Sequence, residues 1–107
     1  MLATLFIKQV SMGTVDFSVT DETMGAIGGV LQPSDAYYVY QSVIQELCDT
    51  NGIANIEHLS LSVILIDNTK LQPDGGIGIT DIAGIDEIYI ELAGLDDEEI
   101  AKITDYS

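Results

Sequence analysis

The clearest pattern in the chain is a two-residue alternation of apolar and polar positions, which is typical of half-buried strands. It occurs over Thr14–Val19 and again over Glu87–Leu92. Strand-forming residues also fill Leu2–Val10, and a turn at Ser11–Gly13 would join the first two segments into a hairpin. The stretch His58–Asp67 becomes apolar on both faces, which predicts a strand in the middle of a sheet.

Helical spacing of apolar residues begins after Pro33. Ser34 suits an N-cap, and Gly52 suits a left-handed stop, so the pattern predicts a helix over Ser34–Thr50. Its apolar stripe consists of Tyr37, Tyr40, Val43, Ile44, Leu47 and Cys48. A second, short helix is predicted over Asp96–Tyr106, where acidic residues crowd the first turn and Ile100 and Ile103 would dock on the core.

The remaining segments complete the predicted fold. Thr20–Pro33 could begin with a short capped helix, but its three glycines favour an irregular turn or loop. Lys70–Gln72 is predicted as a short strand, and Ile77–Ile82 as a strand or an ordered loop. The sequence therefore predicts an α+β fold: an antiparallel or mixed sheet of about five strands, one main helix packed on one face, and a short C-terminal helix. The 107 residues form a single domain, residues 1–107.

Charge is the strongest feature of the composition. The chain has 18 acidic residues against three lysines, with a formal net charge of −15. Such a chain is a poor ligand for nucleic acid backbones and for anionic membranes, because both require cations. It also lacks the arginines that commonly clamp phosphoryl groups. A strongly negative surface instead favours encounter with a basic partner, although the same charge also promotes solubility alone.

No apolar run is long enough to span a bilayer, and the first residues resemble a strand and not a signal peptide. Cys48 is the single cysteine, so no internal disulfide forms. A lone thiol fits a reducing compartment, and we therefore expect a cytoplasmic protein.

Negative charge is concentrated towards the C-terminus. The segment DEIYIELAGLDDEEI (Asp86–Ile100) contains seven carboxylates and no cation. On the strand Glu87–Leu92, Tyr89 stands between two glutamates on the polar face, which combines an aromatic anchor with complementary charge for a cation. The same pattern also fits a solvated sheet face followed by an ordinary acidic helix start. We predict that the partner-binding surface consists of Asp86, Glu87, Tyr89, Glu91, Asp96, Asp97, Glu98 and Glu99.

Other motifs offer weaker chemistry. The stretch DGGIGITDI (Asp74–Ile82) partly matches a calcium-binding nonapeptide, but its aspartate arrives one position late and only one copy exists. Catalysis by Cys48 with His58 would need the two to meet in space, and a residue on the helix stripe is more typical of the core. We therefore expect no catalytic residues, no metal site and no cofactor, and the chain is not expected to be an enzyme.

The whole chain, and most of all LQPDGGIGITDIAGIDEIYIEL (Leu71–Leu92), resembles the small acidic immunity proteins that bacteria make against their own toxins, as in contact-dependent inhibition systems. This resemblance implies a cytoplasmic antitoxin that binds a cognate basic toxin, commonly a nuclease, and covers its active or substrate-binding site. Two alternatives remain open from the sequence: a phage-type nucleic-acid mimic of the anti-CRISPR kind, and a small calcium-binding domain.

Overall fold

The computed structural model describes residues 1–52 and 59–105 of the chain. Within these residues, seven strands and two helices form an α+β fold, which confirms the predicted class. In chain order the elements are β1 (Leu2–Ile7), β2 (Val10–Asp16), β3 (Ser18–Asp21), β4 (Ala26–Pro33), α1 (Tyr37–Asn51), β5 (Leu61–Leu65), β6 (Ile77–Thr80), β7 (Tyr89–Leu92) and α2 (Asp97–Thr104).

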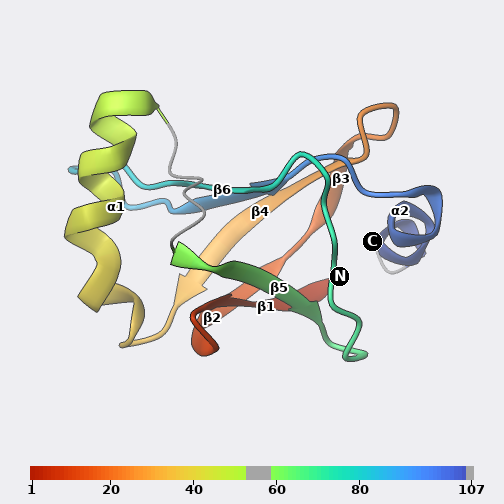
Figure 1. Cartoon of the computed structure of the whole chain (residues 1–107), viewed down its shortest axis with the longest axis horizontal. Helices are drawn as coiled ribbons and strands as arrows, with labels where there is room; N and C mark the ends of the chain where they lie inside the picture. Colours follow the sequence, from red (N-terminus) through yellow and green to blue (C-terminus); the bar gives the residue numbers. More distant parts are fainter. Residues whose placement is uncertain (53–58, 106–107) are drawn as a thin grey trace.

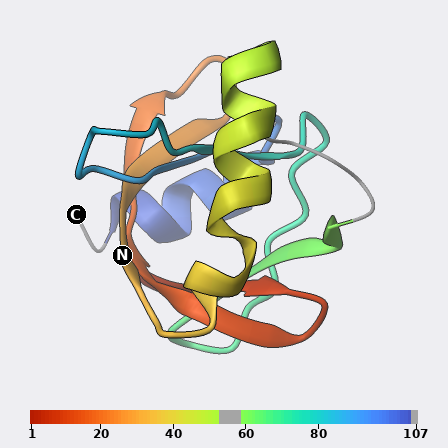
Figure 2. The same cartoon turned by 90° about the vertical axis from the view of Figure 1, so that its left-hand side faces the viewer.

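All strands belong to one antiparallel sheet with the order β5-β1-β2-β4-β7-β6, and β3 pairs with β4 beside β2. The sheet lies between the two helices, with α1 at one end of the long axis and α2 at the other (Figure 1). Figure 2 shows that the sheet curls strongly and that α1 stands across its open side. The curl lets one sheet enclose a core without a second sheet.

Strands β2 and β3 behave as one bent strand that follows a single edge of β4. The bend falls at Phe17, whose side chain is buried and whose N–H donates 2.9 Å to the carbonyl of Met1. The terminal ammonium of Met1 in turn donates 2.6 Å to the carbonyl of Phe17. The start of the chain is therefore fixed where the sheet turns its corner.

The first hairpin is confirmed, but its turn is not at Ser11–Gly13 as predicted. The chain reverses at Lys8 and Gln9, which both adopt positive φ, as a two-residue turn between twisted strands requires. Gly13 instead lies within β2, beside a shift of register opposite Leu5 and Phe6. The glycine that indicated a turn therefore marks an irregularity of the strand.

The prediction for Thr20–Pro33 was wrong, since most of this segment is strand. It contains the end of β3, a turn and the whole of β4, which lies in the interior of the sheet. Gly28 and Gly29 permit close packing there. A Cβ atom at Gly28 would overlap the ring of Tyr89, and one at Gly29 would lie 2.6 Å from the carbonyl oxygen of Asp16. These glycines lower strand propensity but are needed by the tertiary structure.

The predicted central strand His58–Asp67 is the edge strand β5, so its predicted position was wrong. His58 lies outside the described residues. The apolar second face of this strand arises from Ile64, which is half-buried, and from Ile66, which follows the strand and is exposed. The predicted strand Lys70–Gln72 is reduced to one bridge, between Ile64 and Lys70.

The main helix is confirmed with altered ends. It begins at Tyr37, because Ser34 donates its hydroxyl to the carbonyl of Ser11 and does not cap the helix. At the other end Gly52 adopts the left-handed conformation and donates its N–H to the carbonyl of Cys48, 2.7 Å away, as predicted. Within the described residues, neither helix is long and apolar enough to cross a membrane.

The C-terminal helix α2 and the strand β7 follow the predicted patterns closely. Asp96 is the N-cap of α2, and Ile100 and Ile103 are buried as expected. Tyr106, the predicted end of this helix, lies outside the described residues. The three alternating positions of the β7 segment that were expected to face inwards are all buried: Ile88, Ile90 and Leu92.

Candidate interaction surface

The predicted surface residues lie in two separate groups. Asp86 and Glu87 precede β7, and Tyr89 and Glu91 are on it, whereas Asp96–Glu99 begin α2. Figure 1 shows the loop before β7 beside α1 at one end of the molecule, and α2 at the other end. The long axis of the molecule measures 35 Å. The structure therefore divides the predicted surface and does not bring its eight residues into one patch.

Tyr89 is held against the outer face of the sheet. Its ring packs over Gly28 of the neighbouring strand β4, and the tyrosine is half-buried. The cross-strand partners of Tyr89 are Val30 on one side and Thr80 on the other. An aromatic ring over a strand glycine shields the bare backbone and loses little freedom when a partner binds. Tyr89 is therefore a preorganised part of this face.

Glu91 lies between two glycines, Gly28 of β4 and Gly78 of β6. It is exposed, and its carboxylate has no hydrogen bond or ion pair with the described residues. With no side chains at the two directly opposite positions, the carboxylate is open to an incoming cation. The predicted alternation along β7 is thus confirmed, with Glu91 outward and Tyr89 beside it.

A shallow pocket lies at the other end of β7. Its volume is about 230 Å³, and it is lined by Thr80, Ile82, Ile85, Glu87 and Tyr89. Ile82 and Ile85 are 41% and 56% exposed, although both are large apolar residues. Glu87 is exposed and contributes a carboxylate to the lining. An apolar floor with a carboxylate at its border is the arrangement that binds a side chain with both an aliphatic part and a positive charge.

The acids of α2 have a structural role in part. The carboxylate of Asp96 accepts a 2.8 Å hydrogen bond from the N–H of Glu99, and Glu99 accepts one from the N–H of Asp96, which forms a capping box. Glu99 also accepts a 2.9 Å hydrogen bond from the N–H of Gln72. Asp97 and Glu98 remain exposed at this end of the molecule. Two of the four predicted residues are therefore committed to the fold.

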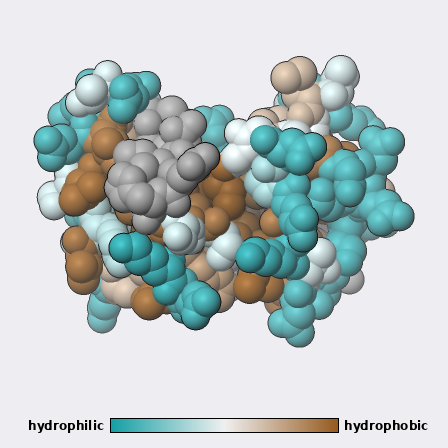
Figure 3. All heavy atoms as spheres, in the orientation of Figure 1, coloured by the Kyte–Doolittle hydropathy of each residue, from teal (hydrophilic) through white to brown (hydrophobic). Residues whose placement is uncertain are grey.

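The sequence analysis missed apolar residues on the outer face of α1. Tyr38, Val39 and Val43 are exposed there, and Figure 3 shows hydrophobic side chains over α1 on this face of the molecule. Val43 had been predicted as part of the buried stripe. With Ile82 and Ile85, these residues concentrate exposed apolar surface towards the α1 end. The signal was present in the sequence, because the helix has apolar residues at more positions than one stripe needs.

The sequence analysis also missed a buried polar cluster around Asp81. This residue is 1% exposed, and its carboxylate accepts hydrogen bonds from Tyr37 Oη at 2.7 Å, Gln41 Nε2 at 3.2 Å and Gln45 Nε2 at 3.1 Å. The donors recur every four residues along α1, so they lie on one stripe. Burial, together with the hydrogen bond to Asp81, raises the pKa of Tyr37 well above its usual range. The cluster fixes α1 to the end of β6.

Cys48 belongs to the same contact between helix and sheet. Its thiol donates to the carbonyl of Ile79 at 3.3 Å and accepts from the N–H of Asp81 at 3.4 Å. These backbone groups belong to the open edge of β6, which has a strand neighbour only on the other side. The buried thiol thus takes the place of a ladder partner. Its burial confirms the prediction of a core cysteine.

No group of three or more His, Cys, Asp or Glu side chains within residues 1–52 and 59–105 could hold a metal ion. The aspartate of the partial calcium motif, Asp81, has its carboxylate bound by α1. The Cys48–His58 pair cannot be assessed as a geometry, because His58 lies outside the described residues.

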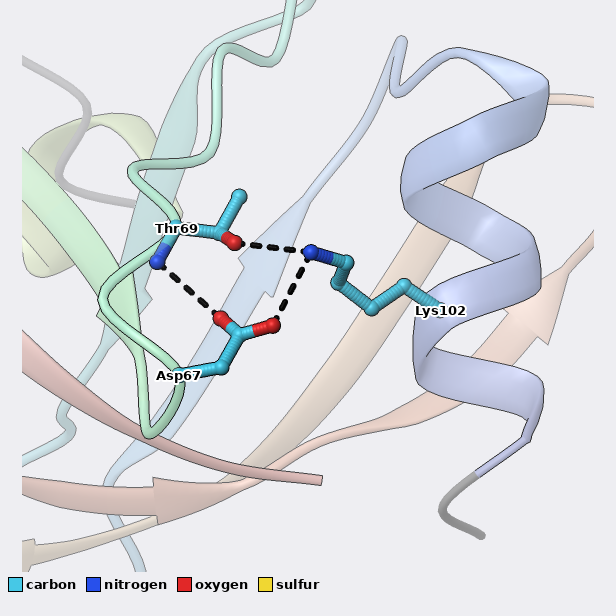
Figure 4. Close-up of polar contacts among 3 residues, drawn as sticks. All are labelled: Asp67, Thr69 and Lys102. Carbon is cyan, nitrogen blue, oxygen red and sulfur yellow. Dashed lines mark hydrogen bonds and ion pairs between the residues drawn. The ribbon is translucent and has the colours of Figure 1, made fainter.

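One ion pair joins α2 to the turn after β5. Lys102 Nζ lies 2.9 Å from a carboxylate oxygen of Asp67 and donates to the hydroxyl of Thr69 at 2.8 Å (Figure 4). The N–H of Thr69 donates 3.0 Å to the other oxygen of Asp67. The hydrogen bond from Lys102, and then those from Thr69, lower the pKa of Asp67 to about 2. Lys102 is therefore engaged within the fold.

Comparison with known protein families, with curated proteins and with solved structures finds no match to this chain.

Proposed function

We propose that the protein is a non-enzymatic cytoplasmic binding protein that neutralises a basic partner by covering its active or substrate-binding site. The model for this role is an immunity protein acting on its cognate toxin. One observation carries the proposal: the pocket of Ile82, Ile85 and Tyr89 is bordered by Glu87, and the free carboxylate of Glu91 follows on the same face. We refer to these five residues as the β7 surface.

The β7 surface has the composition of a hot spot in a protein–protein interface. Such hot spots combine a preorganised aromatic residue with apolar contacts and are surrounded by polar groups. Tyr89 supplies the aromatic ring, while Ile82 and Ile85 are exposed at a cost that a partner would remove. Glu87 and Glu91 select a cation against an anion or a neutral group.

A nuclease is the partner class that fits best. Nucleases must keep a basic cleft to hold phosphates, and a carboxylate-rich surface can occupy that cleft in place of the nucleic acid. The net charge of −15 would speed the encounter at low salt by roughly 10–10³-fold over a neutral pair. Specific retention would then depend on the apolar pocket, which salt does not screen.

Capture from the lysate of the native host, followed by washes of rising salt, tests the proposal. We expect one basic protein to stay bound at high salt and to lose its toxic or nuclease activity in the complex. Ile85→Asp should weaken this complex by about 30-fold or more, which is the loss typical of an interface hot spot. Glu87→Lys with Glu91→Lys should slow association and flatten its salt dependence.

The matched control is Asp97→Lys with Glu98→Lys, which makes the same change in net charge at the other end of the molecule. It should leave retention at high salt intact. Equal losses in both double variants would show that only total charge matters, and the β7 surface would then be wrong. A captured partner that keeps its full activity in the complex would contradict inhibition.

A further inference from the structure

The two lysines that make no ion pair lie on one surface pocket. Lys102 is bound to Asp67, whereas Lys8 and Lys70 have no ion pair or side-chain hydrogen bond with residues 1–52 and 59–105. Both line a pocket together with Gln9, Ser60, Leu61 and Ser62, at the edge of β5. Both lysines thus border one pocket in a chain with 18 acids.

The backbone sets the position of Lys8 at this pocket. Lys8 and Gln9 form the turn between β1 and β2 with φ of 50° and 71°, and Ser60 also has a φ of 50°. Three of the four non-glycine residues with positive φ in the described part of the chain therefore line this pocket. The hairpin turn requires the positive φ of Lys8 and Gln9, whereas Ser60 lies outside that turn. A positive φ is uncommon for a residue with a side chain, and such residues are found at binding sites more often than elsewhere.

Among the described residues, the pocket is lined by donor-bearing side chains and by no carboxylate. The carbonyl of Ser60 accepts a hydrogen bond from the N–H of Lys8 at 3.3 Å, so it points towards β1. The N–H of Leu61 belongs to the same trans peptide and therefore points the opposite way, out of the free edge. Its partner is absent from the described residues, because β5 has a strand only on the β1 side at this level.

The lining thus includes two lysines, two serines and Leu61, whose N–H is free. No acidic residue is among the six described residues that line the pocket. Lys70 also borders a second pocket with Asp74, Asp96 and Glu99, but none of these carboxylates lies within 4.0 Å of its ammonium.

From this geometry we infer an oxyanion site on the edge of β5, formed by Lys8, Lys70, Ser60, Ser62 and the N–H of Leu61. Its ligand is a phosphate group with two negative charges, either free phosphate or a phosphomonoester. Two ammonium groups match a dianion, and hydroxyl and N–H donors satisfy its further oxygens. The site lies apart from the β7 surface and does not depend on the proposed function.

Titration with inorganic phosphate at pH 7.5 and constant ionic strength tests this inference. Amide resonances of Lys8, Ser60, Leu61 and Ser62 should shift and saturate, while those of α2 should stay constant. Lys8→Gln and Lys70→Gln should each weaken binding at least tenfold. Thr23→Glu, in the exposed turn between β3 and β4, makes the same change in net charge away from the pocket and should alter the affinity less than twofold.

Parallel titrations with acetate and with O-phosphoserine define the ligand. Acetate should bind at least tenfold more weakly than phosphate, because it carries one charge. Tighter binding of phosphoserine than of phosphate would assign the site to a phosphorylated partner, and the reverse would assign it to the free ion. No saturable shift, equal binding of acetate, or equal weakening by Thr23→Glu would overturn the inference.

Discussion

The hydroxyl of Tyr37 donates a 2.7 Å hydrogen bond to the carboxylate of Asp81, and this pair joins the first turn of α1 to the end of β6. The carboxylate is buried without a cation beside it in the described residues. Only hydrogen-bond donors offset its desolvation, namely Tyr37 and the amides of Gln41 and Gln45. Each of these donors should therefore contribute more than an ordinary surface hydrogen bond.

Tyr37→Phe removes the shortest of these bonds and keeps the ring. We expect the free energy of unfolding to fall by about 1.5–3 kcal/mol, the range for a hydrogen bond to a charged group. Urea denaturation followed by far-UV circular dichroism measures the change. Tyr38→Phe is the control, because Tyr38 is exposed and its hydroxyl forms no hydrogen bond with the described residues. Equal stability of the two variants would show that the Tyr37 hydroxyl is not needed to hold Asp81.

Gly28→Ala tests the packing of Tyr89 on the sheet. An added Cβ would overlap the tyrosine ring, so the ring must move or the strands must shift. We expect a loss of about 1–3 kcal/mol in the free energy of unfolding, as for other overpacked sites. Gly28→Ala combined with Tyr89→Ala should recover part of this loss, because the second change removes the ring.

The double-mutant cycle also contains its own control. If Gly28→Ala costs the same with and without the ring of Tyr89, the glycine is required by the backbone of β4 alone. A favourable coupling of about 0.5–3 kcal/mol would place the cost in the contact between the two residues.

The sequence predicted correctly those elements whose apolar periodicity and end signals match their place in the fold. The alternation at Ile88, Ile90 and Leu92 gave the inner face of β7, and the helix from Pro33 to Gly52 was recognised by its spacing and its stop. Strand β4 was missed because its glycines lower strand propensity, and the reason for Gly28 is a tyrosine 61 residues later in the chain. No local window contains that contact.

The candidate surface was predicted in composition but not in extent. Glu87, Tyr89 and Glu91 share the outer face as expected, because alternation fixes the face of a strand. The sequence could not show that α2 and the loop before β7 lie at opposite ends of the molecule, which divides the predicted surface. The exposure of Ile82 and Ile85 could not be predicted from the sequence either, since apolar residues beside a strand are normally assigned to the core.

Cys48 should be unreactive in the folded protein. Its sulfur is buried and forms hydrogen bonds with Ile79 and Asp81 across the edge of β6. A thiol reagent such as DTNB should modify it only at the rate at which α1 opens, and urea should raise that rate by orders of magnitude. Fast modification in native buffer would contradict the position of α1 on β6.

Cys48→Ala should also lower the free energy of unfolding, by about 1–3 kcal/mol, since two backbone groups lose their partner.

The ion pair of Lys102 with Asp67 gives stability a defined dependence on pH. The pKa of Asp67 is lowered from 3.8 to about 2 in the folded protein, so the folded state binds its proton more weakly than the unfolded chain does. The pair therefore contributes its full stabilisation above pH 3.8 and loses it as the pH falls towards about 2.

Titration of the Asp67 carboxylate by NMR should give a midpoint near 2, and Lys102→Gln should move this midpoint back towards 3.8. Lys8→Gln changes the same charge without touching Asp67 and should leave the midpoint near 2. A midpoint of Asp67 that is the same in Lys102→Gln as in the unaltered chain would show that the contact between α2 and the turn after β5 does not persist in solution.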